Sequence, residues 1–102
     1  MREVVVSETV LNRVSELKDF LLHELNLSEE TAQNYVGRIE RFLLHLGSLV
    51  DYPPCRFKRW HEKGYHCAVF EKNWVFAYEL FVDGIIIRDM SNTALLNDPI
   101  AE

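Results

Sequence analysis

The sequence predicts an α+β domain in which two helices precede three antiparallel strands and pack on one face of their sheet. Two amphipathic helical patterns fill the first half of the chain, and short apolar stretches separated by turn residues fill residues 66–90. With 102 residues, 48% of them hydrophobic and 26% charged, the chain fits one domain over residues 1–102. The expected element order is β-α-α-β-β-β.

The first half of the chain predicts a strand and a helical hairpin. Residues 4–6 are three valines, which suit a short strand, and Ser7 follows as an N-cap. Helical spacing relates Val10, Val14, Leu17, Leu21 and Leu25. Asn26 closes this helix and Ser28 caps the next one, which ends near Gly47. Its apolar stripe comprises Ala32, Tyr35, Val36, Ile39, Phe42, Leu43 and Leu46.

A basic segment connects the helices to the sheet. Pro53 and Pro54 end the helical pattern, because proline lacks an N–H donor and restricts the residue before it. Residues 56–63 contain four Lys or Arg residues and one acidic residue, a local charge of +3 in a chain of net charge −5. The net charge opposes a broad, non-specific grip on nucleic-acid phosphates.

Two turn signals set the expected register of the three strands. Asp83-Gly84 is typical of a two-residue hairpin turn with positive φ, and Lys72-Asn73 is a weaker signal of the same kind. The first turn pairs Val82 with Ile85, Phe81 with Ile86, Leu80 with Ile87 and Glu79 with Arg88. The second pairs Glu71 with Trp74, Cys67 with Tyr78 and His66 with Glu79. Together they place His66, Glu79 and Arg88 in one row.

Alternation along the strands separates an apolar face from a mixed face. The apolar face, which we expect to form the core, comprises Val69, Trp74, Phe76, Tyr78, Leu80, Ile85 and Ile87. The mixed face comprises His66, Ala68, Phe70, Val75, Ala77, Glu79, Arg88 and Met90. Its polar groups gather near the middle, so we expect function there.

The cysteine pattern and the N-terminal residues indicate a cytoplasmic protein. Cys55 and Cys67 are too few for a disulfide framework, and we expect both to be reduced thiols. No spacing typical of a zinc site is present, and we expect no metal and no cofactor. The first eight residues lack the apolar region of a signal peptide, and no apolar run approaches the ~20 residues of a membrane span.

The order of elements and several stretches resemble the RelE/ParE superfamily, the toxins of bacterial type II toxin–antitoxin (plasmid stabilisation) operons. The resemblance covers nearly the whole chain. It rests on the Ser7-capped helix, the helix ending at Leu46-Gly47, the strand 74–80 with its Tyr78, and the turn and apolar strand 83–88. It implies a toxin that inhibits growth and is neutralised by a cognate antitoxin. RelE-like members cleave messenger RNA in the ribosomal A site, and ParE-like members poison DNA gyrase.

Departures from the RelE pattern favour a ParE-like member. The arginine that RelE-like toxins commonly carry three residues before the matched tyrosine falls on Val75, and residues 91–94 replace their C-terminal basic motif. A net charge of −5 also suits ribosomal phosphates poorly. The resemblance therefore implies inhibition through protein contacts, with DNA gyrase as the target. The alternatives are a ribosome-dependent mRNA endoribonuclease with a non-standard active site and an inert binding module of the same fold.

Three sets of residues are candidates for function. His66, Glu79 and Arg88 suit acid–base chemistry beside a phosphate, or else form a charge ladder that stabilises the sheet. Tyr35 and Phe42 line an antitoxin groove, or else belong to the core. The target-binding candidates, whose alternating cations and aromatic rings also suit nucleic acid, are Arg56, Lys58, Arg59, Trp60, His61 and Lys63.

Overall fold

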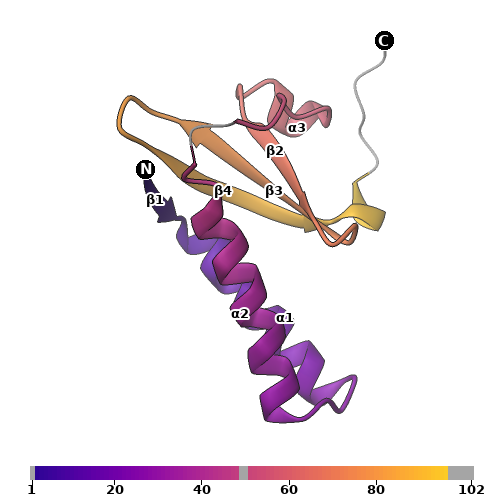
Figure 1. The fold of residues 1–102 in the computed structure, drawn as a ribbon. Coiled ribbons are helices and arrows are strands. Elements are labelled where there is room, and N and C mark those ends of the chain that lie inside the picture. Colours follow the sequence, from indigo (N-terminus) through magenta and orange to yellow (C-terminus); the bar gives the residue numbers. More distant parts are fainter. Residues whose placement is uncertain (1, 49–50, 97–102) are drawn as a thin grey trace.

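The computed structural model describes residues 2–48 and 51–96, and it has the expected β-α-α-β-β-β order with an additional short helix before the second strand (Figure 1). The predicted α+β class is confirmed. The elements are β1 (Glu3–Val6), α1 (Glu8–His23), α2 (Glu29–His45), α3 (Lys58–His61), β2 (His66–Phe70), β3 (Trp74–Leu80), β4 (Gly84–Asn92) and the 3-10 helix η1 (Thr93–Leu95).

The strands form one sheet in the order β1-β4-β3-β2. The three C-terminal strands are antiparallel, whereas β1 runs parallel to β4. The sequence alone did not predict that the first strand joins the sheet beside the last. The helical hairpin lies on one side of the sheet and α3 lies on the other, which we call the outer face (Figure 1).

Both predicted N-caps are confirmed. The Ser7 side chain accepts a hydrogen bond from the Val10 N–H at 3.4 Å, and the Ser28 side chain accepts one from the N–H three residues later at 3.1 Å. Asn26 adopts a φ of 54° in the connection between the helices. Because α1 already ends at His23, Leu25 lies beyond the helix and is 52% exposed, so its assignment to the apolar stripe was wrong.

The core lies between the two long helices and the inner face of the sheet. From β3 and β4 it takes Phe76, Tyr78, Ile85 and Ile87, as the strand alternation predicts. The buried residues that the helices supply are Val10, Leu17, Leu21, Ala32, Ile39, Leu43 and Leu46. The predicted helical stripes therefore face the predicted side of β3 and β4.

The turn between β2 and β3 lies one residue earlier than predicted. Glu71 and Lys72 have the positive φ values, 46° and 67°, that the sequence suggested for Lys72 and Asn73. Asn73 then remains as a third loop residue, because Phe70 pairs with Trp74. The expected pairing of Glu71 with Trp74 is therefore wrong.

This shift of one residue exchanges the two faces of β2. Ala68 and Phe70, expected on the mixed face, are buried in the core. Val69, expected in the core, is 54% exposed on the outer face. His66 pairs with Tyr78 rather than with Glu79.

The β3–β4 turn is also displaced, but by two pairing positions, so the faces are retained. The Phe81 N–H donates to the Gly84 carbonyl oxygen at 2.8 Å, which leaves Val82 and Asp83 as the central turn residues. Gly84 has a different purpose from the one predicted. A Cβ atom at this position would lie 2.5 Å from the Glu3 carbonyl oxygen, so the glycine allows β1 to approach β4.

Arg88 is an extra residue in β4. Tyr78 pairs with Ile87, whereas Ala77 pairs with Asp89, so no residue of β3 is directly opposite Arg88. The bulge reverses the alternation beyond it. Met90, expected on the mixed face, is consequently 1% exposed and belongs to the core.

We predict that Gly84→Ala lowers the free energy of unfolding by about 1–3 kcal/mol, because backbone atoms of β1 occupy the space that the new methyl group needs. Gly37→Ala in α2 is the matched control, since its Cβ would only touch the Arg41 side chain at 3.5 Å. We expect this control to be more stable by about 0.5–1 kcal/mol. Urea unfolding of both variants measures the difference, and equal stability of the two would contradict the close approach at Gly84.

Candidate functional site

The outer face is covered over β2 and β3 by the segment that contains α3. Trp60 is 2% exposed and packs in one cluster with Val75 and Ala77, which are 1% and 0% exposed. Phe57 and Tyr65 are partly buried at the margin of this cluster. The prediction that Val75 and Ala77 lie on an open, mixed surface was therefore wrong: a second, small apolar core lies above them.

A disulfide between Cys55 and Cys67 fastens this segment to β2, so the expectation of two reduced thiols was wrong. The Cys55 N–H donates to the Tyr65 carbonyl oxygen at 2.9 Å, and the Cys67 N–H donates to the Pro53 carbonyl oxygen at 3.2 Å. These bonds bring the two cysteine Cα atoms to 4.8 Å, a separation that suits a disulfide. Residue spacing alone could not reveal this pairing.

Five of the six residues predicted to bind a target are exposed on and around α3. We call these residues, Arg56, Lys58, Arg59, His61 and Lys63, the basic patch. Trp60 does not belong to it, because its ring lies in the small outer core. The sequence identified the cations correctly as a surface group, but it could not show that the aromatic ring among them faces inward.

Trp60 and Asp89 connect the basic patch to the rest of the fold. The indole Nε1 donates to Asp89 Oδ2 at 3.3 Å, and Asp89 Oδ1 lies 3.2 Å from Arg13 Nε on α1. The same oxygen accepts a hydrogen bond from the Met90 N–H at 2.8 Å. One carboxylate therefore joins α3, α1 and β4, and sequence reasoning did not identify it.

The predicted catalytic row is not assembled. Arg88 Nε donates to Glu79 Oε1 at 2.8 Å on the outer face, with both side chains about one-third exposed. His66 lies on the inner face, where its ring stacks on Tyr78 with 5.5 Å between centroids. Its Nδ1 lies 2.6 Å from the Tyr52 carbonyl oxygen. The one-residue shift in β2 separates the imidazole from the Glu79–Arg88 ion pair. What remains is an ion pair on the sheet, as the alternative interpretation of a charge ladder expects.

Tyr78 is fully buried beneath this histidine. Its hydroxyl oxygen accepts a hydrogen bond from the Tyr52 N–H at 2.9 Å. Burial raises the pKa of the Tyr78 hydroxyl above its ordinary value of 10.0, so the phenol stays protonated at neutral pH. We infer a structural role for this tyrosine, which fixes the chain that leads from α2 towards the outer face.

Tyr35 and Phe42, the predicted antitoxin contacts, lie between α2 and the sheet. The Tyr35 hydroxyl accepts a hydrogen bond from Trp74 Nε1 at 3.1 Å. The Phe42 ring packs on Phe70 with 5.1 Å between centroids. These contacts support the alternative interpretation, in which both residues belong to the core.

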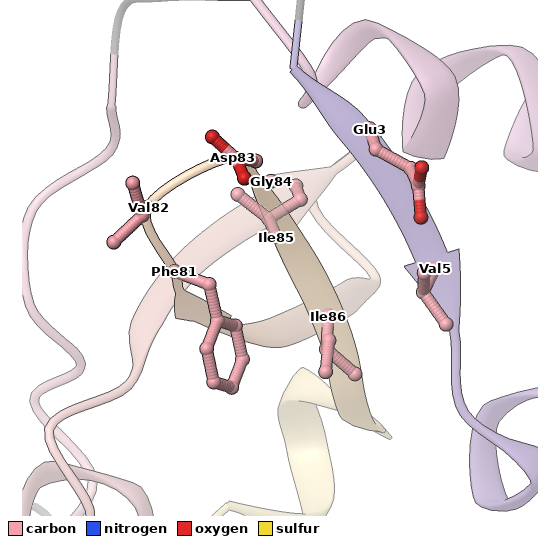
Figure 2. A pocket seen from close by; sticks show the side chains of 8 residues that line it. All are labelled: Glu3, Val5, Phe81, Val82, Asp83, Gly84, Ile85 and Ile86. Carbon is pink, nitrogen blue, oxygen red and sulfur yellow. The ribbon is translucent and has the colours of Figure 1, made fainter.

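An exposed apolar surface that the sequence did not reveal borders β1. Figure 2 shows Val5 on β1 beside Ile86 on β4 and the β3–β4 turn. Val5, Phe81 and Val82 are 44%, 48% and 97% exposed, and they line an open depression of about 480 Å³. The displaced turn is the reason, because it leaves Phe81 and Val82 outside the paired strands.

A second apolar depression lies on the helical side of the same strand. It has a volume of about 430 Å³ and includes Val6, Leu11 and Leu44, of which the two leucines are 57% and 61% exposed. Between the two depressions runs the outer edge of β1, which pairs with no further strand in the described part of the chain. The Glu3 N–H donates to the Asp83 carbonyl oxygen, just before β4, and the Ser7 N–H donates to the Ile87 carbonyl oxygen in β4. Ladder alternation therefore points the backbone groups at positions 4 and 6 outward.

Comparison of the chain with protein-family models, curated proteins and solved structures gave no significant match. Within residues 2–48 and 51–96, no helix has the length and apolar character that crossing a membrane requires. In that part of the chain, no three His, Cys, Asp or Glu side chains gather closely enough to bind a metal ion.

Proposed function

We propose that this chain is the toxin of a bacterial type II toxin–antitoxin pair and that it inhibits growth by binding a protein target. The observation that carries the proposal is the basic patch, held on the outer face of an otherwise acidic chain by the disulfide and Trp60. The RelE/ParE resemblance, which rests in part on the predicted element order, supplies DNA gyrase as the target.

Electrostatics support a protein target of opposite charge. The basic patch places four Lys or Arg side chains and one histidine within eight residues, whereas the chain as a whole has a net charge of −5. Such local asymmetry orients a partner whose contact surface is acidic and accelerates its association. A long phosphate backbone, in contrast, would extend beyond the patch onto surfaces of the same sign as its own charge.

The ribonuclease alternative has one observation in its favour. Phe57 and Tyr65 are partly exposed beside the cations, and the Lys63 ammonium lies 5.9 Å from the centroid of the Tyr65 ring. Rings of this kind can stack on single-stranded bases. Against it, Glu79 neutralises Arg88 at 2.8 Å, and the His66 imidazole lies on the other face.

We place the antitoxin at the open edge of β1. An extended segment of a partner protein would hydrogen-bond to the outward groups of Val4 and Val6, and its apolar side chains would fill the depressions on the two faces. Glu3 and Asp83 border the outer depression, so the segment would also carry a basic residue. This location replaces the groove expected at Tyr35 and Phe42.

A cytoplasmic location is part of this proposal, because DNA gyrase acts on the chromosome; the disulfide replaces the reduced thiols on which the expectation from sequence partly rested. The basic patch and the β1 edge lie apart, because β1 stands at one end of the strand order and the segment that carries the patch covers β2 and β3. An antitoxin on β1 would therefore neutralise the toxin by extending across the outer face or by changing its conformation.

We predict that Lys58→Glu/Lys63→Glu abolishes growth arrest when the chain is expressed in bacteria. Like charges in a contact cost enough to weaken target binding by roughly tenfold or more. Colony counts after induction measure the effect. The matched control is Arg41→Glu/Lys72→Glu, which makes the same charge change at exposed positions on α2 and the β2–β3 turn and should still arrest growth.

The mode of arrest separates the hypotheses. Arrest with DNA damage and loss of supercoiling by purified gyrase supports the proposal. Arrest with cleaved messenger RNA supports the ribonuclease, and normal growth with the unmodified chain indicates the inert binding module. Either of the last two results contradicts a gyrase-directed toxin.

We predict that Val5→Lys/Val82→Lys leaves the chain toxic but prevents its rescue by the antitoxin, because charged side chains would then occupy the depression that the partner must fill. The probe is the protein encoded by the reading frame next to that of the chain, co-expressed in the growth assay. Val69→Lys, at a 54% exposed site on β2, is the control that should still be rescued. Equal rescue of both variants would remove β1 from the antitoxin interface.

A further inference from the structure

We propose that thiol–disulfide exchange at Cys55–Cys67 regulates the basic patch: the oxidised chain presents the patch in a fixed arrangement, and reduction releases it. This inference rests on the proposed function, because it concerns the surface that contacts the target. Nothing in the sequence pattern suggested it, since two cysteines twelve residues apart fit no known redox spacing.

The disulfide closes a ring that contains the entire basic patch. Its two cysteines are separated by 12 positions, and every patch residue from Arg56 to Lys63 lies between them. The bond therefore restricts these cations and little else. The long helices and the pairing of β3 with β4 are outside the ring.

Other contacts also hold the ring. Phe57 and Tyr65 pack against the small outer core, His61 Nδ1 lies 3.0 Å from the Cys55 carbonyl oxygen, and Arg56 and Arg59 each have an interaction partner. The side chain of Trp60 packs on β3 and bonds to Asp89 at 3.3 Å. The Cys55 and Cys67 N–H groups each donate one backbone hydrogen bond across the base of the ring. The helix α3 has only four residues and no side-chain cap. A helix this short is not stable by itself, so its order depends on these contacts.

Closing a loop of this length disfavours its open states by about a hundredfold. Reduction should therefore raise the population of the open segment by up to that factor. A contact that depends on several cations in one arrangement loses affinity when they are no longer held in place, because binding must then order them again.

The exchange chemistry balances with a dithiol protein as reductant. Cys55 is 1% exposed, whereas Cys67 is partly exposed on the edge strand β2, so the reductant's thiolate attacks the Cys67 sulfur. A mixed disulfide forms, and Cys55 leaves as a thiolate that takes up a proton. The second thiol of the reductant then displaces Cys67. The protein gains two electrons and two protons, and the reductant becomes a disulfide.

Amide hydrogen exchange tests whether the disulfide holds residues 55–67 in place, and it needs no binding partner. In the oxidised chain, the Trp60, Tyr65 and Cys67 N–H groups donate backbone hydrogen bonds and should exchange slowly. Reduction with dithiothreitol should accelerate their exchange by up to about a hundredfold and leave the amides of α2 unchanged. The Cys55→Ser/Cys67→Ser variant should exchange rapidly with and without reductant. Equal protection in oxidised and reduced wild type would overturn the proposal.

Inhibition of gyrase supercoiling, measured in thiol-free buffer, tests the regulatory role. Oxidised wild type should inhibit at least about tenfold more strongly than reduced, alkylated wild type, and the double serine variant should resemble the reduced form. Equal inhibition by both forms would overturn regulation while retaining the proposed function. Absence of inhibition in both forms would overturn the proposed function, and the exchange measurement would still decide whether the disulfide controls the segment.

Discussion

The hydrogen-bond register of β3 with its two neighbours is the constraint on which the rest of the structure depends. Because side chains alternate along a strand, a shift of one residue would move a whole set from one face to the other. The pairing of His66 with Tyr78 sends Phe70 into the core and Cys67 to the outer face. The disulfide, the burial of Trp60 and the position of the basic patch all follow from that pairing.

The sequence predicted the elements that depend on local periodicity. The two helices, their serine caps and the inward face of β3 follow from apolar spacing and capping chemistry. It failed at Glu71, Arg88 and Gly84, for three different reasons. The turn at Glu71 has positive φ at Glu and Lys, residue types that rarely adopt it. The bulge at Arg88 can be recognised only once the pairing of β3 with β4 is known. Gly84 accommodates a strand from the other end of the chain.

The sequence predicted which charged residues belong to the candidate site better than it predicted how they are arranged. The cations of the basic patch were identified because they cluster in the sequence, and such a cluster can be recognised without knowledge of the tertiary structure. Trp60 and Cys55 were misassigned, because their burial depends on how residues 53–65 fold back over β2 and β3. The predicted row of His66, Glu79 and Arg88 does not form, because the one-residue shift of β2 moves His66 to the inner face. Only the ion pair between Glu79 and Arg88 is present.

The chain thus has two unlike surfaces on separate parts of one sheet. The apolar edge at β1 suits a partner that adds a strand, and the basic patch beside β2 suits a charged target. The separation of the two surfaces is a direct consequence of the strand order, since β1 and the segment above β2 could lie together only in a closed barrel.

Nuclear Overhauser effects between α-protons test the register of β2 and β3 most directly. Cys67 and Ala77 are directly opposite each other in a pair without mutual hydrogen bonds, the geometry that brings two Cα atoms closest in an antiparallel ladder. A strong effect between their α-protons is the predicted result. A strong effect between the α-protons of Cys67 and Tyr78 instead would contradict this register. His66 would then lie on the outer face, and Cys67 would no longer face the segment that carries the basic patch.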